Sequence, residues 1–145
     1  MGVEELPQSS PLKTANYSKA IKLPFISFDH LPEWFNHEYE PTKYYETTTF
    51  GEKHLDLNCF ITRIESDEMA PLFTQDTFLI VKKQKNIQKD DIILILNTFN
   101  KILVRKYLML NGERYLISSN PKHEIINFDN SLKLLGIVIE GRILI

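Results

Sequence analysis

The sequence predicts a mostly β domain with short helical turns at most. Apolar stretches of strand length recur between turn signals such as Asn111-Gly112 and Asn120-Pro121. Segments with the 3.6-residue period of an amphipathic helix are almost absent. The chain has 145 residues, of which 43% are apolar, and this length is enough for one domain with a hydrophobic core.

The chain divides into three parts. Residues 1–20 are polar and Pro-containing without an apolar period, and we expect a flexible tail or linker there. Residues 21–53 start with a short extended stretch and continue, through Leu31-Pro32-Glu33-Trp34-Phe35, as a turn and an irregular arm. Residues 54–145 contain the expected core strands and form the main domain.

The strands of residues 54–145 are predicted from apolar alternation or from short apolar runs. From His54 onward, apolar and polar residues alternate, which predicts a strand with one apolar face. That face carries Leu55, Leu57, Cys59 and Ile61. Further strands are expected at residues 78–82, 92–96, 102–108, 114–118, 134–139 and 142–145.

The arm of residues 21–53 is rich in aromatic residues. Because basic residues do not alternate with them, we favour packing of the arm on the β core over stacking on nucleic-acid bases or gripping a partner. The side chains concerned are Trp34, Phe35, Tyr39, Tyr44 and Tyr45.

Composition excludes several classes of protein. The net charge of −2 and the pI near 6.1 show that the whole chain is not a basic nucleic-acid binder. The single cysteine, Cys59, excludes an internal disulfide framework and a cysteine-rich zinc site and is typical of a reducing compartment. The histidines lack metal-ligand spacing, so we expect no metal and no cofactor. No apolar run approaches the roughly 20 residues of a membrane span, and the start lacks a secretory signal, which predicts a cytoplasmic protein without membrane contact.

One motif points to a class of chemistry. The segment Ser66-Asp67-Glu68-Met69-Ala70-Pro71 resembles the nucleophile motif G-D-S-M-x-P of the LexA, UmuD and phage-repressor family of self-cleaving Ser-Lys peptidases. The resemblance continues in the family's order. Residues 76–81 are similar to its acidic turn and apolar strand, Leu103-Val104-Arg105-Lys106 to its V-K-R strand, Ser119-Asn120-Pro121 to its N-P turn, and Leu135-Gly136-Ile137-Val138 to its G-x-V strand. The resemblance implies a LexA-like peptidase fold of twisted antiparallel sheets.

The sequence departs from the family at the reacting groups. Glu68 stands at the position of the serine nucleophile and has no hydroxyl to attack a carbonyl. Arg105 stands at the position of the lysine base, and a guanidinium stays protonated at physiological pH. Lys106 is a poor substitute because adjacent residues of a strand face opposite sides. Ser66 would need a base of its own and would lie about 6 to 7 Å from Glu68 along an extended strand.

The expected cleavage site is altered as well. Residues 23–32 resemble the cleavage arm of phage repressors, but Leu31-Pro32 replaces the Ala-Gly bond. Proline fixes φ, lacks an N–H and restricts the preceding residue, so this bond is hard to thread into an extended pose. Because nucleophile, base and scissile bond are all changed, we expect that the activity is lost and that the chain has no catalytic residues.

The two vestigial positions suggest an interaction. If Glu68 and Arg105 occupy the dyad positions, they face each other and can form a bidentate, charge-assisted pair. We therefore hypothesise an ion pair in the former active site. The alternative is that the two are unrelated surface charges.

The C-terminal run predicts self-association. Residues 134–145 are strongly apolar apart from Glu140-Gly141-Arg142, and an exposed edge strand of this kind invites pairing with a second chain. Because family members also dimerise through this domain, we expect a two-fold homodimer, with an internal core strand as the alternative. The resemblance implies that DNA is bound only through an N-terminal helix-turn-helix domain, which residues 1–22 cannot hold. The chain is thus expected to be either part of a longer repressor or a stand-alone UmuD-like protein.

The leading interpretation is a catalytically inactive peptidase-like domain that dimerises a transcriptional regulator. Its former active-site cleft is expected to bind a regulatory protein or peptide. Two alternatives stay open: a self-cleaving peptidase with a non-standard nucleophile, such as Ser66 with Lys106, and a stand-alone UmuD-like interaction module.

Overall fold

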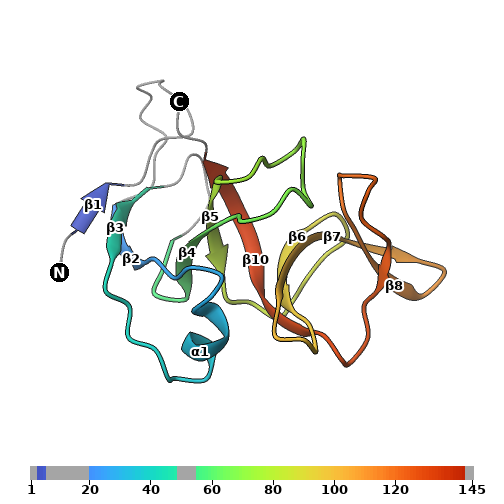
Figure 1. Ribbon diagram of the computed structural model, residues 1–145, viewed down its shortest axis with the longest axis horizontal. Helices are drawn as coiled ribbons and strands as arrows, with labels where there is room; N and C mark the ends of the chain where they lie inside the picture. Colours follow the sequence, from blue (N-terminus) through green and yellow to red (C-terminus); the bar gives the residue numbers. More distant parts are fainter. Residues whose placement is uncertain (1–2, 6–19, 49–54, 143–145) are drawn as a thin grey trace.

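The computed structural model describes residues 3–5, 20–48 and 55–142 and contains two β-sheets (Figure 1). The smaller sheet has the strand order β1-β3-β2, with β1 at Val3–Glu5, β2 at Ile21–Pro24 and β3 at Tyr44–Thr47. The larger sheet has the order β4-β5-β10-β6-β7-β8-β9. All strand pairs of the larger sheet are antiparallel. The prediction of a mostly β fold is confirmed.

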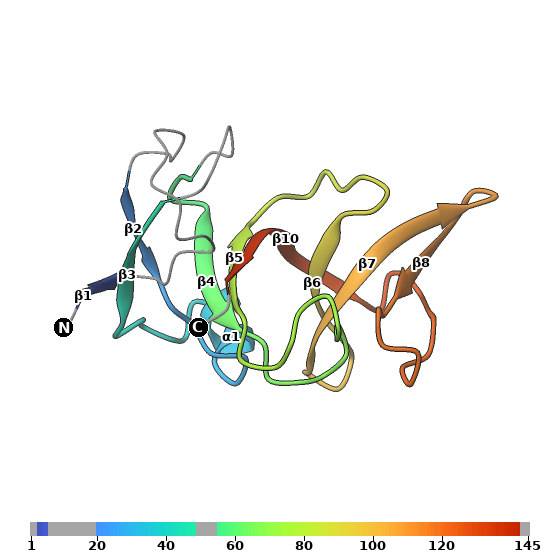
Figure 2. The same ribbon diagram turned by 90° about the horizontal axis from the view of Figure 1, so that it is seen from above.

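The strands of the larger sheet follow the apolar runs of the sequence closely. They are β4 at Cys59–Arg63, β5 at Phe78–Lys82, β6 at Ile92–Leu96, β7 at Ile102–Leu110, β8 at Glu113–Ile117, β9 at Ile126–Asn127 and β10 at Lys133–Arg142. The predicted bounds of β5 and β6 are confirmed, and those of β7 and β8 differ by one or two residues. The sheet is strongly twisted, and the β7–β8 hairpin extends away from the rest of the molecule (Figure 2).

The strand expected from His54 begins later than predicted. Residues 57–58 form a turn, in which the Asn58 N–H donates to Asp56 Oδ1 at 2.8 Å and the Cys59 N–H donates to the Asp56 carbonyl at 3.0 Å. Leu57 is consequently 83% exposed and does not belong to the predicted apolar face. His54 itself lies outside the described residues.

Both faces of β4 are buried, which a simple alternation could not predict. Phe60 packs in one apolar cluster with Leu31, while Cys59 and Ile61 pack in a second with Leu23 from β2. The backbone of the arm joins this strand, because the Ile26 N–H donates to the Ile61 carbonyl at 2.9 Å.

The C-terminal run is a single central strand rather than an exposed edge. β10 lies between β5 and β6, so the premise of edge pairing is wrong for residues 133–142. Gly136 permits this position, because a Cβ there would lie 2.6 Å from the carbonyl oxygen of Lys82 on β5. The strand predicted at residues 142–145 lies outside the described residues beyond Arg142.

The arm is more regular than predicted. Leu31–Phe35 form the short helix α1, whose first turn accommodates Pro32 because the leading N–H groups of a helix need no internal partner. The aromatic rings of Trp34 and Phe35 lie 5.1 and 5.8 Å from the ring of Phe60. The prediction that the aromatic arm packs on the β core is confirmed for these side chains.

Two segments expected to be irregular are strands. Tyr44–Thr47 forms β3 and pairs antiparallel with β2. Val3–Glu5, which the sequence places in the tail, forms β1 and pairs parallel with β3. Backbone pairing at a sheet edge uses N–H and C=O groups, so it needs no apolar period in the added strand.

Candidate functional site

Three segments that are far apart in the sequence meet at the candidate site. The segment of residues 66–71, which we call the motif loop, follows β4, and the loop of residues 118–125 follows β8. The Ser119 hydroxyl donates to the Ala70 carbonyl at 3.0 Å, and the Asn120 amide donates to the Asp67 carbonyl at 3.0 Å. The side chain of Arg105 reaches the motif loop from β7. The structure therefore brings together the segments on which the sequence resemblance rests.

Glu68 and Arg105 form a buried ion pair in the middle of this site. Each residue is 4% exposed, and Arg105 Nη1 lies 3.8 Å from Glu68 Oε1. The interpretation as unrelated surface charges is therefore wrong. The expected bidentate geometry is also not present, because Nε and Nη1 of Arg105 have no hydrogen-bond partner among the described residues.

The hydrogen bonds of Glu68 come from other groups. The backbone N–H of Val104 donates to Oε1, and the Ser66 hydroxyl donates to Oε2 at 3.2 Å. The Glu68 carboxylate therefore fixes the motif loop to the backbone of β7 and also faces the guanidinium of Arg105. None of these donors beyond Arg105 was predicted from the sequence, because they depend on the loop conformation.

The electrostatics of Glu68 are dominated by burial. Removal from water raises the pKa of the Glu68 carboxyl above its ordinary value. The Val104 N–H, the Arg105 guanidinium and the Ser66 hydroxyl act in the opposite direction, in that order, and lower this pKa only in part.

Ser66 and Lys106 do not form the alternative dyad in this structure. Residues 66–67 form a bend and residues 68–70 a turn instead of an extended strand, so the Ser66 hydroxyl contacts the Glu68 carboxylate directly. Lys106 is 41% exposed in its side chain and lies 3.7 Å from Asp90 Oδ1. Its neighbour Arg105 is buried, as expected for adjacent residues on opposite faces of β7.

The side chain of Asp67 is held by His123, one of the histidines whose spacing excluded a metal site. His123 Nε2 lies 2.9 Å from Asp67 Oδ1, and this hydrogen bond lowers the pKa of the exposed Asp67 carboxyl. His123 follows Asn120-Pro121 by two positions, which was the only sequence signal for this contact. Of the other motif residues, Met69 is buried in the core and Pro71 is exposed.

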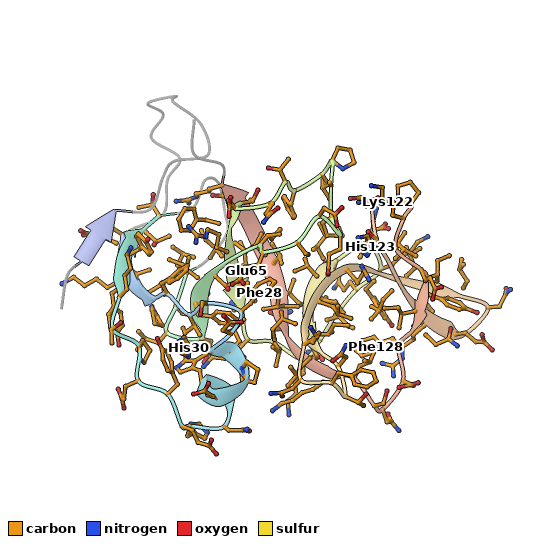
Figure 3. The ribbon with its side chains drawn as sticks, in the orientation of Figure 1. Phe28, His30, Glu65, Lys122, His123 and Phe128 are labelled. Atoms are coloured by element: carbon orange, nitrogen blue, oxygen red, sulfur yellow. The ribbon has the colours of Figure 1, made fainter. Side chains whose placement is uncertain are left out.

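The arm and the motif loop border the same cavity. The Phe28 N–H donates to Glu65 Oε2 at 3.2 Å, and Figure 3 shows these two residues side by side. A cavity of about 470 Å³ lies here, lined by Phe28, Asp29, Pro32, Glu65, Ser66, Phe99, Asn100, Lys101 and Ile102. The Leu31-Pro32 peptide stands at the start of α1, with Leu31 fully buried. The arm thus lies beside the cavity, but its supposed scissile bond is helical and not extended.

The described part of the chain holds no cluster of three or more His, Cys, Asp or Glu side chains suited to a metal ion. Within the same residues, no helix is long and apolar enough to cross a membrane.

The twisted antiparallel sheet is consistent with the fold of a LexA-like peptidase domain. A comparison with protein families matches residues 31–139 to the family described as Peptidase S24-like. The chain belongs to this family, which comprises the C-terminal domains of LexA, UmuD and phage repressors. None of the curated proteins compared with the chain matches it.

Proposed function

We propose that this chain is a catalytically inactive peptidase-like domain that dimerises a LexA-like transcriptional regulator. The observation that carries the proposal is the buried contact between Glu68 and Arg105 at the two positions of the dyad. In the proposal, this contact takes the place of the catalytic pair and holds the motif loop against β7.

The chemistry of self-cleavage requires groups that these positions do not supply. A serine hydroxyl must lose its proton to a neutral amine and attack a peptide carbonyl. Glu68 offers a carboxylate that accepts hydrogen bonds from Val104 and Ser66. Arg105 offers a guanidinium, which cannot accept a proton near neutral pH.

Two observations support the proposed regulatory role: the family of the chain and the cavity beside the motif loop. In the proposal, two copies associate through this domain, and a linked helix-turn-helix domain on each copy contacts DNA, so that affinity comes from avidity. The cavity beside Pro32 and Ser66 is the proposed site for a regulatory protein or peptide. The protein is proposed to act in the cytoplasm.

The proposal is tested by the intact mass of the purified protein after long incubation at neutral and strongly alkaline pH. Alkaline pH would neutralise a lysine base and is therefore the more demanding condition. We expect an unchanged mass in both buffers. A single defined fragment would overturn the proposal, and its disappearance in Ser66→Ala would identify Ser66 as the nucleophile. A fragment common to both proteins that serine-protease inhibitors of contaminating enzymes abolish would be discounted, and one that persists would identify another nucleophile of the chain.

One contact favours self-cleavage with a non-standard nucleophile as the second candidate. The Ser66 hydroxyl lies 3.2 Å from a carboxylate whose pKa is raised by burial, which is the arrangement of a nucleophile beside a base. Arg105 opposes this role, because its charge stabilises the ionised carboxylate and weakens it as a base. The mass measurement with Ser66→Ala decides between the two candidates. A stand-alone UmuD-like module would have the same inactive site, and its native open reading frame would begin at Met1, whereas that of a longer repressor would begin upstream.

A further inference from the structure

The β7–β8 hairpin has one buried and one open face. On the buried face, Tyr107 and Leu116 are paired across the two strands and pack with Ile93 and Ile95 of β6. On the open face, Leu108 pairs with Tyr115, and Leu110, next to the turn, is 55% exposed. Contiguous exposed apolar surfaces are typical of sites that bind another protein or a ligand.

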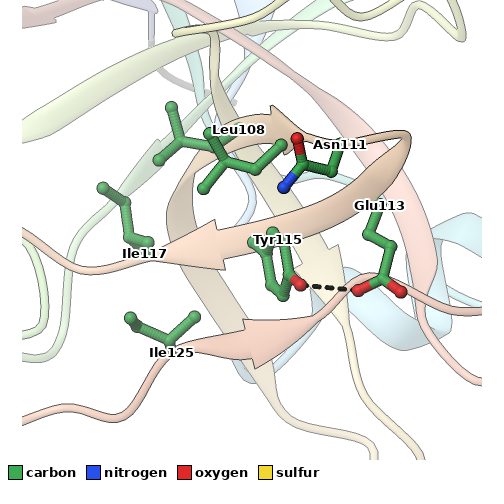
Figure 4. Close-up of a pocket in the computed structure, with 7 residues that line it drawn as sticks. Leu108, Asn111, Glu113, Tyr115, Ile117 and Ile125 are labelled. Atoms are coloured by element: carbon green, nitrogen blue, oxygen red, sulfur yellow. Dashed lines mark hydrogen bonds between the residues drawn. The ribbon is translucent and has the colours of Figure 1, made fainter.

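This open face borders the larger of the cavities described here. The cavity has a volume of about 610 Å³ and is lined by Leu108, Leu110, Asn111, Glu113, Tyr115, Ile117 and Ile125 (Figure 4). Ile125, from the loop that follows β8, is 68% exposed and extends the apolar surface. The surface lies on the opposite side of β7 from Arg105, because 108 and 110 alternate with 105 along the strand.

The charges on this face are arranged for a two-fold contact. Lys106 pairs with Ile117 at the base of the hairpin, and Glu113 pairs with Leu110 near its tip. The Leu108–Tyr115 pair lies midway between them. A two-fold axis through this middle pair would place Lys106 of one copy against Glu113 of the other, twice, because an isologous interface exchanges its two ends.

The local hydrogen bonds are compatible with that exchange. Glu113 accepts the Tyr115 hydroxyl through Oε2 at 2.6 Å, which holds the carboxylate at the rim of the apolar surface (Figure 4). Lys106 contacts Asp90 at 3.7 Å, and an ammonium group carries three protons and can donate to a second carboxylate.

We infer that the open face of the β7–β8 hairpin is the interface between two copies of this chain. The inference deepens the proposed homodimer by giving it a surface. It also replaces the C-terminal strand, which lies in the middle of the sheet and has both neighbours occupied by β5 and β6. The apolar side chains supply the contact area, and the Lys106–Glu113 pairs fix the antiparallel orientation of the two hairpins.

The first test is the dissociation constant of the homodimer, measured by analytical ultracentrifugation over a range of protein concentrations. Leu110→Lys is expected to weaken association about tenfold or more, because it desolvates a lysine and places it near Lys106 of the second copy. The exposed Leu57 on the turn before β4 provides the matched control, and Leu57→Lys should leave the constant unchanged. Circular dichroism of each variant verifies that the domain is folded.

The second test reads the two-fold geometry itself. In a homodimer of Glu113→Lys, Lys106 of each copy faces a lysine of the other copy. In a homodimer of Lys106→Glu, Glu113 of each copy faces a glutamate. Each variant should therefore form a homodimer about tenfold weaker than that of the wild type, because like charges repel. An equimolar mixture of the two variants should form a heterodimer with near wild-type affinity, because both contacts then join opposite charges. Lys83→Glu, which changes an exposed lysine that lies over the ring of Trp34 and not on the hairpin, is the charge control.

The outcomes separate the inferred surface from the proposed function. If the protein dimerises and neither Leu110→Lys nor the charge variants change the constant, the interface lies elsewhere and the homodimer stands. If Leu110→Lys weakens association but the mixture does not recover affinity, the two-fold Lys106–Glu113 arrangement is refuted, and the second copy contacts this face in another orientation. If the wild-type chain is monomeric at all concentrations, the inference and the dimerising role both fail.

Discussion

Removal of either partner of the Glu68–Arg105 pair is expected to destabilise the domain by unequal amounts. Glu68→Ala leaves a guanidinium that is buried and whose Nε and Nη1 already have no hydrogen-bond partner in the described structure. It also removes the acceptor of the Val104 N–H. An uncompensated buried charge of this kind costs about 3 to 5 kcal/mol of the free energy of unfolding.

Arg105→Ala should cost less, about 1 to 3 kcal/mol. The remaining Glu68 carboxyl keeps the Val104 N–H and the Ser66 hydroxyl as donors. Because burial already raises its pKa, it can also take up a proton and avoid an unpaired charge. In the double variant no charge is stranded, so its loss should be smaller than the sum of the two single losses by about 2 kcal/mol.

The assay is urea unfolding at pH 7, followed by circular dichroism at one fixed protein concentration, since association would otherwise shift the midpoint. The exposed pair Arg63–Asp76, whose N···O distance is 3.9 Å, is the matched control and should give a coupling energy below about 1 kcal/mol. Additive losses for Glu68→Ala and Arg105→Ala, within about 0.5 kcal/mol, would refute the reasoning. An Arg105→Ala loss larger than that of Glu68→Ala would refute the assigned asymmetry.

Further expectations concern the same site and the central strand. Glu68→Gln should become more stable relative to the wild type as pH rises above the ordinary glutamate pKa. The raised pKa of Glu68 in the folded state means that the wild type loses free energy of unfolding as pH rises, whereas glutamine does not titrate. A pH-independent difference between the two proteins in urea unfolding would contradict this. His123→Ala should raise the pKa of the Asp67 carboxyl towards its ordinary value, as measured by an NMR titration of the carboxyl carbon. The stability linked to this contact is present above the pKa of Asp67 in the unfolded chain and is lost as pH falls through the lower pKa of the folded state. An unchanged titration midpoint of Asp67 in the variant would show that His123 does not cause the lowered pKa. Gly136→Ala should lower the melting temperature strongly, since its Cβ would lie 2.6 Å from the Lys82 carbonyl oxygen, and a near-native melting curve would show that β5 and β10 can separate without loss.

The sequence predicted best those strands whose residues form short apolar runs between turns. β5 and β6 are such runs, and pairing on both sides buries them without ambiguity. The alternation before Cys59 was misleading, because the Asp56 side chain stabilises a turn in a segment whose pattern fits a strand. The pattern of β10 was misread for another reason: Glu140 and Gly141 interrupt the apolar run, although the strand continues through them and keeps pairing with β5 after a register shift between Val138 and Glu140.

The candidate site was predictable only in part. The resemblance to the family motifs correctly predicted that Glu68 lies opposite Arg105. The role of Ser66 depends on the bend that brings its hydroxyl to Glu68, and the role of His123 depends on how two loops pack against each other, so neither could be predicted. No periodicity in a sequence encodes that packing.

The Val104 N–H gives a physical reason why a carboxylate is accommodated at position 68. A buried ion pair alone is weak support for stability, because apolar residues of similar volume often replace it without loss. At this site the backbone donor of Val104 points at Glu68 and must find an acceptor, or the orphaned group would cost about 1 to 3 kcal/mol. Glu68 provides that acceptor, and Arg105 then neutralises the charge that the acceptor brings into the core. The main role of Glu68 is thus to accept the Val104 N–H, and Arg105 is the secondary partner that balances the charge of the carboxylate.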